Sequence, residues 1–246
     1  MLLVIAGLDP SGGAGLAADI QTATALGAHP APVASLITVQ NTRTVQRSTA
    51  LEATLVVAQA KAVLADMPIA AIKLGALGTA EIGNAVAGLL AQHPEVPVIV
   101  DPVLAASGGG TLAVHALIAV YRERLLPRSI LATPNRAELR ALAPTDGADE
   151  LLALGLPACL VTDGDGHGGS IVHELHTADG IRLIPGGPRR PGDFHGSGCT
   201  FASAIAARIA AGDALEAAIA TAGRFMERAI AQAFTPGQGQ AIPGRW

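Results

Sequence analysis

The sequence predicts an α/β fold in which helices cover both faces of a central, mostly parallel sheet. Short apolar runs alternate along the chain with longer stretches rich in Ala and Leu. This alternation is typical of βα units joined by right-handed crossovers. Half of the 246 residues are hydrophobic and only 15% are charged, against about 25% charged in a typical globular domain. A sheet that is buried on both faces accommodates so much apolar sequence.

The expected strands are short apolar runs. Six of them would form the main part of the sheet: Leu2–Ala6, Pro32–Val39, Ile69–Lys73, Val96–Asp101, Ile130–Thr133 and Ala158–Thr162. Two later runs, Ser170–His173 and Ile181–Ile184, are consistent with a hairpin. The sequence therefore predicts a mainly parallel sheet to which a hairpin is added late in the chain.

The expected helices are the Ala- and Leu-rich stretches between those runs. They are Ala14–Leu26, Leu51–Asp66, Thr79–Gln92, Thr111–Leu125, Arg136–Ala141, Thr200–Ala211 and Leu215–Ala233. Residues 235–246 are rich in Pro and Gly and predict a surface tail. No repeat and no low-complexity linker divides the chain, so we expect residues 1–246 to form a single domain.

Composition argues against several classes of function. The net charge is −4, there is no basic run, and the aromatic residues are one Trp, one Tyr and four Phe, so a nucleic-acid surface is not indicated. The longest charge-free stretches, 20–42 and 102–121, are broken by Pro, Gly and polar residues, which argues against a membrane span. Two cysteines in a chain of this length favour a reducing compartment, and we expect a cytoplasmic protein.

Polar residues mark the ends of the expected strands. Six such residues follow or close the six runs in turn: Asp9, Gln40, Lys73, Asp101, Thr133 and Thr162. Ligands of open α/β sheets bind outside the carboxyl ends of the strands. Each residue alone is also explained by the need for a loop to begin there, but the six together predict a binding site along this edge.

A first glycine loop follows the first strand. Gly13, Gly15 and Ala18 fit the spacing of the dinucleotide fingerprint G-x-G-x-x-A. That fingerprint needs an acidic residue about 20 residues further on, and no acid lies between Asp19 and Glu52. A nicotinamide site is therefore not indicated. Two interpretations remain: a turn with close packing of helix on strand, or a loop whose backbone approaches a small ligand beside Asp9.

A second glycine motif, Asp193–Thr200, runs directly into a helix. Its glycines and the helix N-terminus would expose successive N–H groups, which bind anions. Cys199 lies where those amides and the helix dipole would lower the pKa of a thiol. A cysteine in an Ala-rich helix is also often only a small buried residue. Cys159 lies within an apolar run, and we expect it in the core.

Two acidic residues could help to hold a cation. Asp101 and Glu138 follow neighbouring strands, and Mg²⁺ bound to phosphate prefers carboxylates and water. The simpler interpretation of Glu138 is a first-turn acid behind the N-cap Asn135. Three histidines of the expected hairpin, His167, His173 and His176, show no zinc spacing and are expected to be solvated.

The ordered set of motifs resembles the hydroxymethylpyrimidine/phosphomethylpyrimidine kinases of thiamine biosynthesis, in the ribokinase-like superfamily. The motifs are residues 6–15 with Asp19, 39–42, 73–75, 101–104, 133–138 and 195–200. The resemblance implies a three-layer α/β/α fold and a homodimer. It also implies a kinase that uses ATP and Mg²⁺ to phosphorylate 4-amino-5-hydroxymethyl-2-methylpyrimidine and its monophosphate.

The resemblance also implies a role for individual residues. Gln40 would pair with the aminopyrimidine edge, in a pocket to which Asp9, Gly7, Ala14, Ala76 and Val103 contribute. Cys199 would be the general base, and Gly196, Ser197 and Gly198 would form the anion hole. Thr162, Asp163 and Gly164 would approach the phosphates of the nucleotide, together with Gly196 and Gly198. Asp101 and Glu138 would organise Mg²⁺.

Two other functions remain open at this point. Close relatives of the family accept pyridoxine-type alcohols, so a pyridoxal or pyridoxine kinase is an alternative. The loops at 105–110 and 162–166 depart from the family's pattern. The first loop lacks the Lys or Thr and the Asp that the family usually carries there. The second has Thr162, Asp163 and Gly164 where the family usually has Lys-Gly-Gly. A non-catalytic pyrimidine-binding domain is therefore the second alternative.

Overall fold

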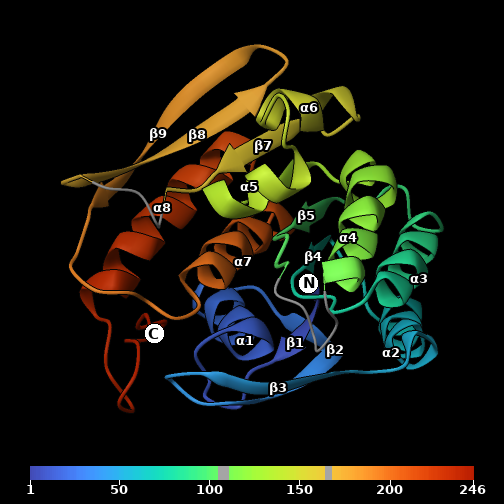
Figure 1. Cartoon of the computed structure of the whole chain (residues 1–246), viewed down its shortest axis with the longest axis horizontal. Coiled ribbons are helices and arrows are strands. Elements are labelled where there is room, and N and C mark those ends of the chain that lie inside the picture. The colour runs from blue at the N-terminus through green and yellow to red at the C-terminus, as the bar shows by residue number, and fades with distance from the viewer. Residues whose placement is uncertain (105–110, 164–167) are drawn as a thin grey trace.

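The computed structural model describes residues 1–104, 111–163 and 168–246, without the side chains of 111–113. Across these residues the strands form one nine-stranded sheet in the order β3-β2-β1-β4-β5-β6-β7-β8-β9 (Figure 1). The strands are β1 Leu2–Leu8, β2 Pro30–Gln40, β3 Val45–Ala50, β4 Ala71–Leu74, β5 Val98–Val100, β6 Leu131–Ala132, β7 Ala158–Val161, β8 Ser170–Thr177 and β9 Gly180–Pro188.

The middle of the sheet is parallel and its two edges are antiparallel. Strands β2, β1, β4, β5, β6 and β7 run parallel to one another. At one edge β3 pairs antiparallel with β2, and at the other edge β8 and β9 form an antiparallel hairpin. The parallel strands therefore bring their carboxyl ends to one side of the sheet, where the polar residues follow them.

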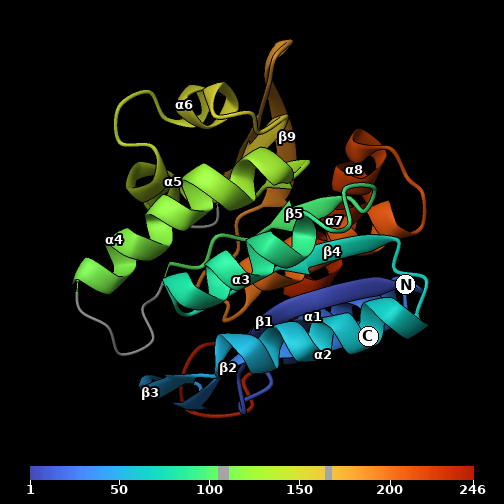
Figure 2. The ribbon, with the colours of Figure 1, turned by 90° about the vertical axis from the view of Figure 1, so that its right-hand side faces the viewer.

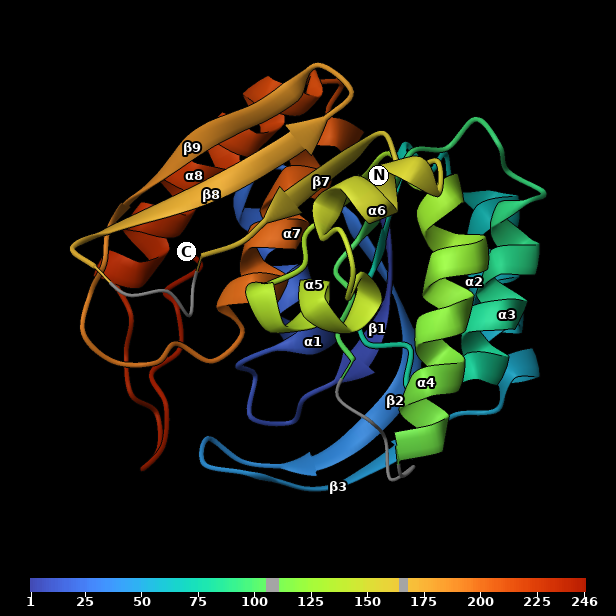
Figure 3. The same ribbon diagram turned by 45° about the horizontal axis from the view of Figure 1, so that its top comes forward.

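Helices cover both faces of the sheet, which confirms the predicted three-layer arrangement (Figure 2). One face carries α1 Gly15–Ala25, α7 Ser197–Ala210 and α8 Leu215–Ala231. The other face carries α2 Ala53–Asp66, α3 Ala80–Leu90, α4 Thr111–Val120, α5 Arg136–Leu142 and α6 Ala148–Ala153. Figure 3 shows the two groups of helices on opposite sides of the strands. Among the described residues, no helix is long and apolar enough to cross a bilayer.

Strand β1 shows why the chain needs so few charges. Leu3 and Ile5 point into the core beneath α2 and α3, whereas Leu2, Val4 and Ala6 point into the core beneath α7 and α8. All five side chains are fully buried. A strand that is apolar on both faces is what a sheet between two helical layers requires.

The elements differ from prediction in three places. The short edge strand β3 and the helix α6 were not expected. The expected helix 111–125 ends as an α-helix at Val120 and continues through a π-helical turn, Tyr121–Leu125. Tyr121 is fully buried there, and its hydroxyl donates to the carbonyl oxygen of Gly75 at 3.3 Å. The π-helical turn therefore carries a buried polar contact to the end of β4.

One surface prediction is wrong in part and another is wrong. Residues 235–238 and Gln240 are exposed, as a surface tail requires, but Ile242–Arg245 are buried, because the segment folds back against α8 and the second glycine motif. His173 and His176 are each only 9% exposed, because β8 lies between β7 and β9 in the sheet. Burial lowers the pKa of His173 to about 4. His167 lies outside the described residues.

Helix α5 begins with a capping box. The side chain of Asn135 accepts the amides of Ala137 and Glu138, and Glu138 accepts the amide of Asn135 at 3.0 Å. We expect Asn135→Ala to lower the free energy of unfolding by about 1 kcal/mol, since two amides lose their acceptor. Urea denaturation would measure it. Asn135→Ser, which keeps a capping oxygen, is the matched control. Equal stability of the Ala and Ser variants would contradict the role of the cap.

Candidate active site

Two glycine loops meet beside the carboxyl end of β1. The first glycine loop (residues 9–15) joins β1 to α1, and the second glycine loop (residues 195–198) opens α7. A Cβ on Gly196 would lie 1.9 Å from the carbonyl oxygen of Gly13. Gly196 also has a φ of 79°, which favours glycine. Only a glycine at 196 lets the two loops approach so closely.

The first glycine loop is wrapped around the carboxylate of Asp9. Its Oδ1 accepts the amide of Ser11 at 2.8 Å, and its Oδ2 accepts the amide of Ala14 at 2.9 Å. Burial alone would raise the pKa of Asp9, but the hydrogen bonds from His195 and Ser11 hold it below its ordinary value. The loop also packs helix on strand as predicted, because a Cβ on Gly15 would lie 2.1 Å from the oxygen of Gly7.

His195 joins the first glycine loop to the end of β2. Its Nε2 lies 2.7 Å from Asp9 Oδ2 and 2.9 Å from the side-chain nitrogen of Gln40. One nitrogen cannot donate to Asp9 and accept from Gln40 at once, so the tautomer of His195 decides which partner it serves. The structure thus brings Asp9 and Gln40 together, as the resemblance implied, but through a residue that the sequence analysis missed. The only signal was its place directly before Gly196.

A buried charge cluster lies behind the loops. Lys73 is fully buried at the end of β4, and its Nζ lies 3.0 Å from Asp19 and 3.3 Å from Asp101. Ser203 on α7 donates to Asp19. Burial alone would lower the pKa of Lys73, but the two carboxylates hold it above its ordinary value. Lys73 is therefore a fixed cation at the centre of the site.

The predicted low pKa of Cys199 is wrong. Burial raises the pKa of its thiol to about 12, and Asp101 and Asp19 add to the rise while Lys73 opposes it. The amide of Gly15 donates to the sulfur, but this contact and the N-terminus of α7 do not offset the burial. Cys199 is a neutral thiol at neutral pH. Cys159 is in the core, as predicted.

The two acids expected near a metal ion have different surroundings. Asp101 is 4% exposed, and its Oδ2 has no hydrogen-bond donor although Lys73 lies nearby. Glu138 serves the capping box of α5. The charges of both acids act on Tyr121. Among the described residues, no group of three potential ligands could hold a metal alone. The donors fit Mg²⁺ that reaches the site bound to phosphate.

The other predicted site residues line the same edge of the sheet. Ala76 accepts the hydroxyl of Ser35, and the amide of Val103 donates to the backbone oxygen of Asp101. Thr162 bridges to Asn135, and its amide donates to Pro134. Gly7 is buried against Leu36.

Some of the residues that were predicted to bind phosphate make other contacts within the protein. Asp163 accepts Arg189 at 2.7 Å, and its amide donates to His173. The amide of Ser197 donates to Phe194 rather than toward an anion. Gly198 is exposed in the first turn of α7. Gly164 lies outside the described residues.

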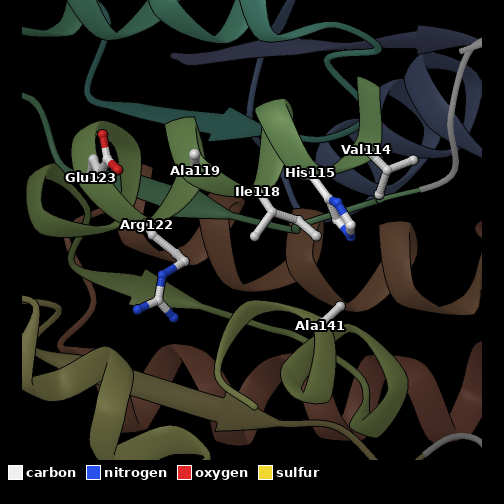
Figure 4. A pocket seen from close by; sticks show the side chains of 7 residues that line it. All are labelled: Val114, His115, Ile118, Ala119, Arg122, Glu123 and Ala141. Atoms are coloured by element: carbon white, nitrogen blue, oxygen red, sulfur yellow. The ribbon is translucent and has the colours of Figure 1, made fainter. Parts of the chain in front are cut away.

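A shallow pocket lies elsewhere, between α4 and α5 (Figure 4). It is lined by Val114, His115, Ile118, Ala119, Arg122, Glu123 and Ala141. None of the predicted site residues is among them. Arg122 is engaged there by Glu150 at 2.6 Å, and the lining includes no residue of either glycine loop.

Comparisons with known proteins identify the family of this chain. A model of the family described as phosphomethylpyrimidine kinase matches residues 9–243. The chain is 38% identical to hydroxymethylpyrimidine/phosphomethylpyrimidine kinase of Synechococcus elongatus, over 99% of this chain and 96% of the relative. It is 36% identical to thiamine biosynthesis bifunctional protein ThiED of Geobacter sulfurreducens over 97% of this chain, and it spans about half (50%) of that relative's length.

The fold is also similar to a solved structure. The ADP complex of Bacillus subtilis pyridoxal kinase superposes with a TM-score of 0.91 at 26% identity, over 99% of this chain and 96% of the other. The similarity extends over the whole described sheet and its helices. That similar structure was solved with a nucleotide, ADP, bound.

The state of Cys199 can be tested by alkylation. We expect its reaction with iodoacetamide to accelerate about tenfold per pH unit from pH 7 to 10, because only the thiolate reacts and the pKa is about 12. Peptide mass spectrometry would follow the label. Cys159, which is fully buried, is the internal control and should stay unlabelled. A plateau in the rate above pH 7 would mean a low pKa instead.

Proposed function

Because this chain belongs to the phosphomethylpyrimidine kinase family, and so is a phosphotransferase of ribokinase-like fold, we propose that it phosphorylates 4-amino-5-hydroxymethyl-2-methylpyrimidine and then its monophosphate. The phosphoryl donor is ATP and the pathway is thiamine biosynthesis. The observation that carries the proposal is the chain of contacts from Asp9 through His195 to Gln40. It gathers a carboxylate, an imidazole and an amide where the two glycine loops meet.

The pyrimidine is held by hydrogen bonds more than by stacking. The amide of Gln40 has both a donor and an acceptor, which matches a ring nitrogen beside an exocyclic amine. The side-chain nitrogen of that amide lies 2.9 Å from His195 Nε2, which in turn lies 2.7 Å from Asp9. Gly7, Ala14, Ala76 and Val103 offer small side chains and backbone groups around the ring. With so few aromatic residues in the chain, this amide is the main source of specificity.

Phosphoryl transfer depends mainly on position and charge. The hydroxymethyl oxygen bonds to the γ-phosphorus, the bond from that phosphorus to ADP breaks, and the hydroxyl proton passes to the thiolate of Cys199, which is the minor form of this side chain at neutral pH. Gly196, Ser197 and Gly198 lie at the N-terminus of α7, whose dipole favours the charge that develops. Lys73 acts on Cys199 by its charge and favours the thiolate that accepts the proton.

The nucleotide and its metal ion would bind at the carboxyl ends of the neighbouring strands β5, β6 and β7. Thr162, Asp163 and Gly164, with Gly196 and Gly198, would approach the phosphates of ATP. Asp101 and Glu138 would hold Mg²⁺, since Asp101 Oδ2 is buried without a hydrogen-bond donor. When bound, the ion supplies positive charge that neutralises the phosphate oxygens.

A homodimer in the cytoplasm is the expected working form. Exposed apolar side chains gather on β2 and β3, namely Ile37, Val39 and Val45, and a second copy of the chain would cover them. Both cysteines are free thiols, which suits a reducing compartment. Light scattering that gives the mass of one chain would contradict the dimer. The chain 1–246 is proposed to act as one domain.

The substrate can be tested directly. A coupled assay with Mg²⁺ and ATP should show turnover of the hydroxymethylpyrimidine, with a higher kcat/KM than for pyridoxal. The alternative of a pyridoxal kinase is favoured by the fold similarity to the Bacillus subtilis enzyme, and the opposite ratio would support it. Binding of the pyrimidine without turnover would support a non-catalytic binding domain and contradict the proposed kinase.

The proposed roles of Cys199 and Gln40 separate in kinetics. We expect Cys199→Ala to lower kcat by about 10²–10⁴-fold, the usual effect of losing a general base. Gln40→Ala is the matched comparison and should chiefly raise KM for the pyrimidine, because it removes binding and not proton transfer. Steady-state kinetics would measure both. A loss below about tenfold in kcat for Cys199→Ala would give this residue a packing role only.

A further inference from the structure

The segment that follows α8 returns to the active site. Phe234 and Ile242 exchange backbone hydrogen bonds at 3.0 and 2.8 Å, so residues 234–242 form a closed loop. Its far end contacts Thr42, just beyond Gln40, through the amide of Gln240 at 3.0 Å. Ala241 accepts the amide of His195 at 2.8 Å. Figure 3 shows this segment descending from α8 toward the end of the β2–β3 pair.

The segment after α8 leads to Arg245, whose side chain lies inside the protein. Its side chain is 3% exposed. Its Nε donates to Thr200 Oγ1 at 2.8 Å, and its Nη1 donates to Gln21 at 3.1 Å and to the carbonyl oxygen of Gly12 at 3.3 Å. Its Nη2 donates to the carbonyl oxygen of Gly13. The guanidinium therefore bonds to the first glycine loop, to α1 and to α7 at once.

The partners of Arg245 are all uncharged. Among the described residues, no carboxylate lies within ion-pair distance of its guanidinium, although most other arginines of this chain that are partly buried contact an acid. A buried cation is costly unless its donors are satisfied. The five N–H donors of a guanidinium lie in one plane. Neutral oxygens can accept from them only where those oxygens are held in place. The carbonyl oxygens of the first glycine loop thus form part of the binding site for the Arg245 side chain.

The contacts of Arg245 converge on the point where the two glycine loops meet. The oxygen of Gly13 that it binds is the atom that a Cβ on Gly196 would strike. Thr200, which accepts from Arg245, donates its own hydroxyl to the oxygen of Gly196 at 2.7 Å. Arg245 therefore bonds to one side of the contact directly and to the other side through one hydroxyl.

We propose that Arg245 is a positioning residue that locks the first glycine loop to the second. It touches none of the reacting atoms. By fixing Gly13 against Gly196 it holds Asp9 on one side, and His195 and the first turn of α7 with Cys199 on the other. The proposal deepens the proposed function, because the substrate's alcohol must meet the phosphoryl group between these two loops.

Three variants and one control test this lock. Arg245→Ala removes the fork, and Arg245→Lys keeps the charge but presents donors from one nitrogen only. Thr200→Val keeps the shape of the side chain and removes both the acceptor of Arg245 Nε and the donor to Gly196, so it serves where Arg245→Ala fails to fold. Arg208→Ala is the control, since Arg208 pairs with Asp213 at the other end of α7.

Amide hydrogen exchange and kinetics give the readouts. We expect all three variants to raise exchange of the amides of residues 9–15 and 195–200 about tenfold or more, with α2 and α3 unchanged. For the same variants kcat should fall about 10–100-fold, the scale of a misplacement near 1 Å, while KM for ATP changes less. Arg208→Ala should match the unmodified protein in both readouts.

The outcomes separate this proposal from the proposed function. Unchanged exchange in Arg245→Ala, or full kcat in Arg245→Lys, would overturn the lock. If the unmodified protein does not phosphorylate the pyrimidine, the proposed function fails, but the exchange experiment still decides whether Arg245 joins the two loops.

Discussion

The contact between the backbones of Gly13 and Gly196 is the constraint on which the rest of the site depends. Strand β1 and helix α7 are almost 200 residues apart along the chain; β1 ends, and α7 begins, at a glycine loop that lies at this point. Because no side chain separates the loops, Asp9 and His195 come within 2.7 Å, and Cys199 receives the amide of Gly15. A proposed binding residue, a bridging residue and a proposed base thus lie close together. Their spacing is set by backbone, which is less mobile than side chains.

The second constraint is the charge held behind the loops. Lys73 faces two acids, Asp19 and Asp101, in a region from which water is excluded. One cation therefore balances two anions, and the cluster keeps an excess of negative charge when both acids are ionised. The charge of Lys73 opposes the rise that burial causes in the pKa of Cys199, whereas the charges of Asp101 and Asp19 add to that rise. In the proposed function, Mg²⁺ beside Asp101 would reduce the excess of negative charge.

The layered fold and the edge that carries the site follow from the sequence, because periodicity and strand-end polarity depend on residues close together in the chain. Asp9, Gln40 and Cys199 could be chosen on that basis and on the resemblance. The pKa of Cys199 could not, since desolvation depends on α1, β4 and α7 packing around it. The bridging role of His195 and the burial of Arg245 were equally hidden, because Gln40 and Gly12, which they contact, lie more than 150 residues away. A segment rich in Pro and Gly has the composition of a surface tail, and only the tertiary contacts give it another place.

The preference between two alcohols cannot be read from the fold. The chain is similar in structure to a pyridoxal kinase and in sequence to pyrimidine kinases, and one scaffold serves both because the phosphoryl-transfer groups are common to the two reactions. Discrimination must come from groups that face the ring. An amide that both donates and accepts matches an aminopyrimidine edge, whereas a pyridine ring with a phenolic oxygen presents a different pattern. In this chain the nitrogen of that amide lies 2.9 Å from the imidazole of His195, so the cost of turning the amide to suit the other ring includes the loss of this contact.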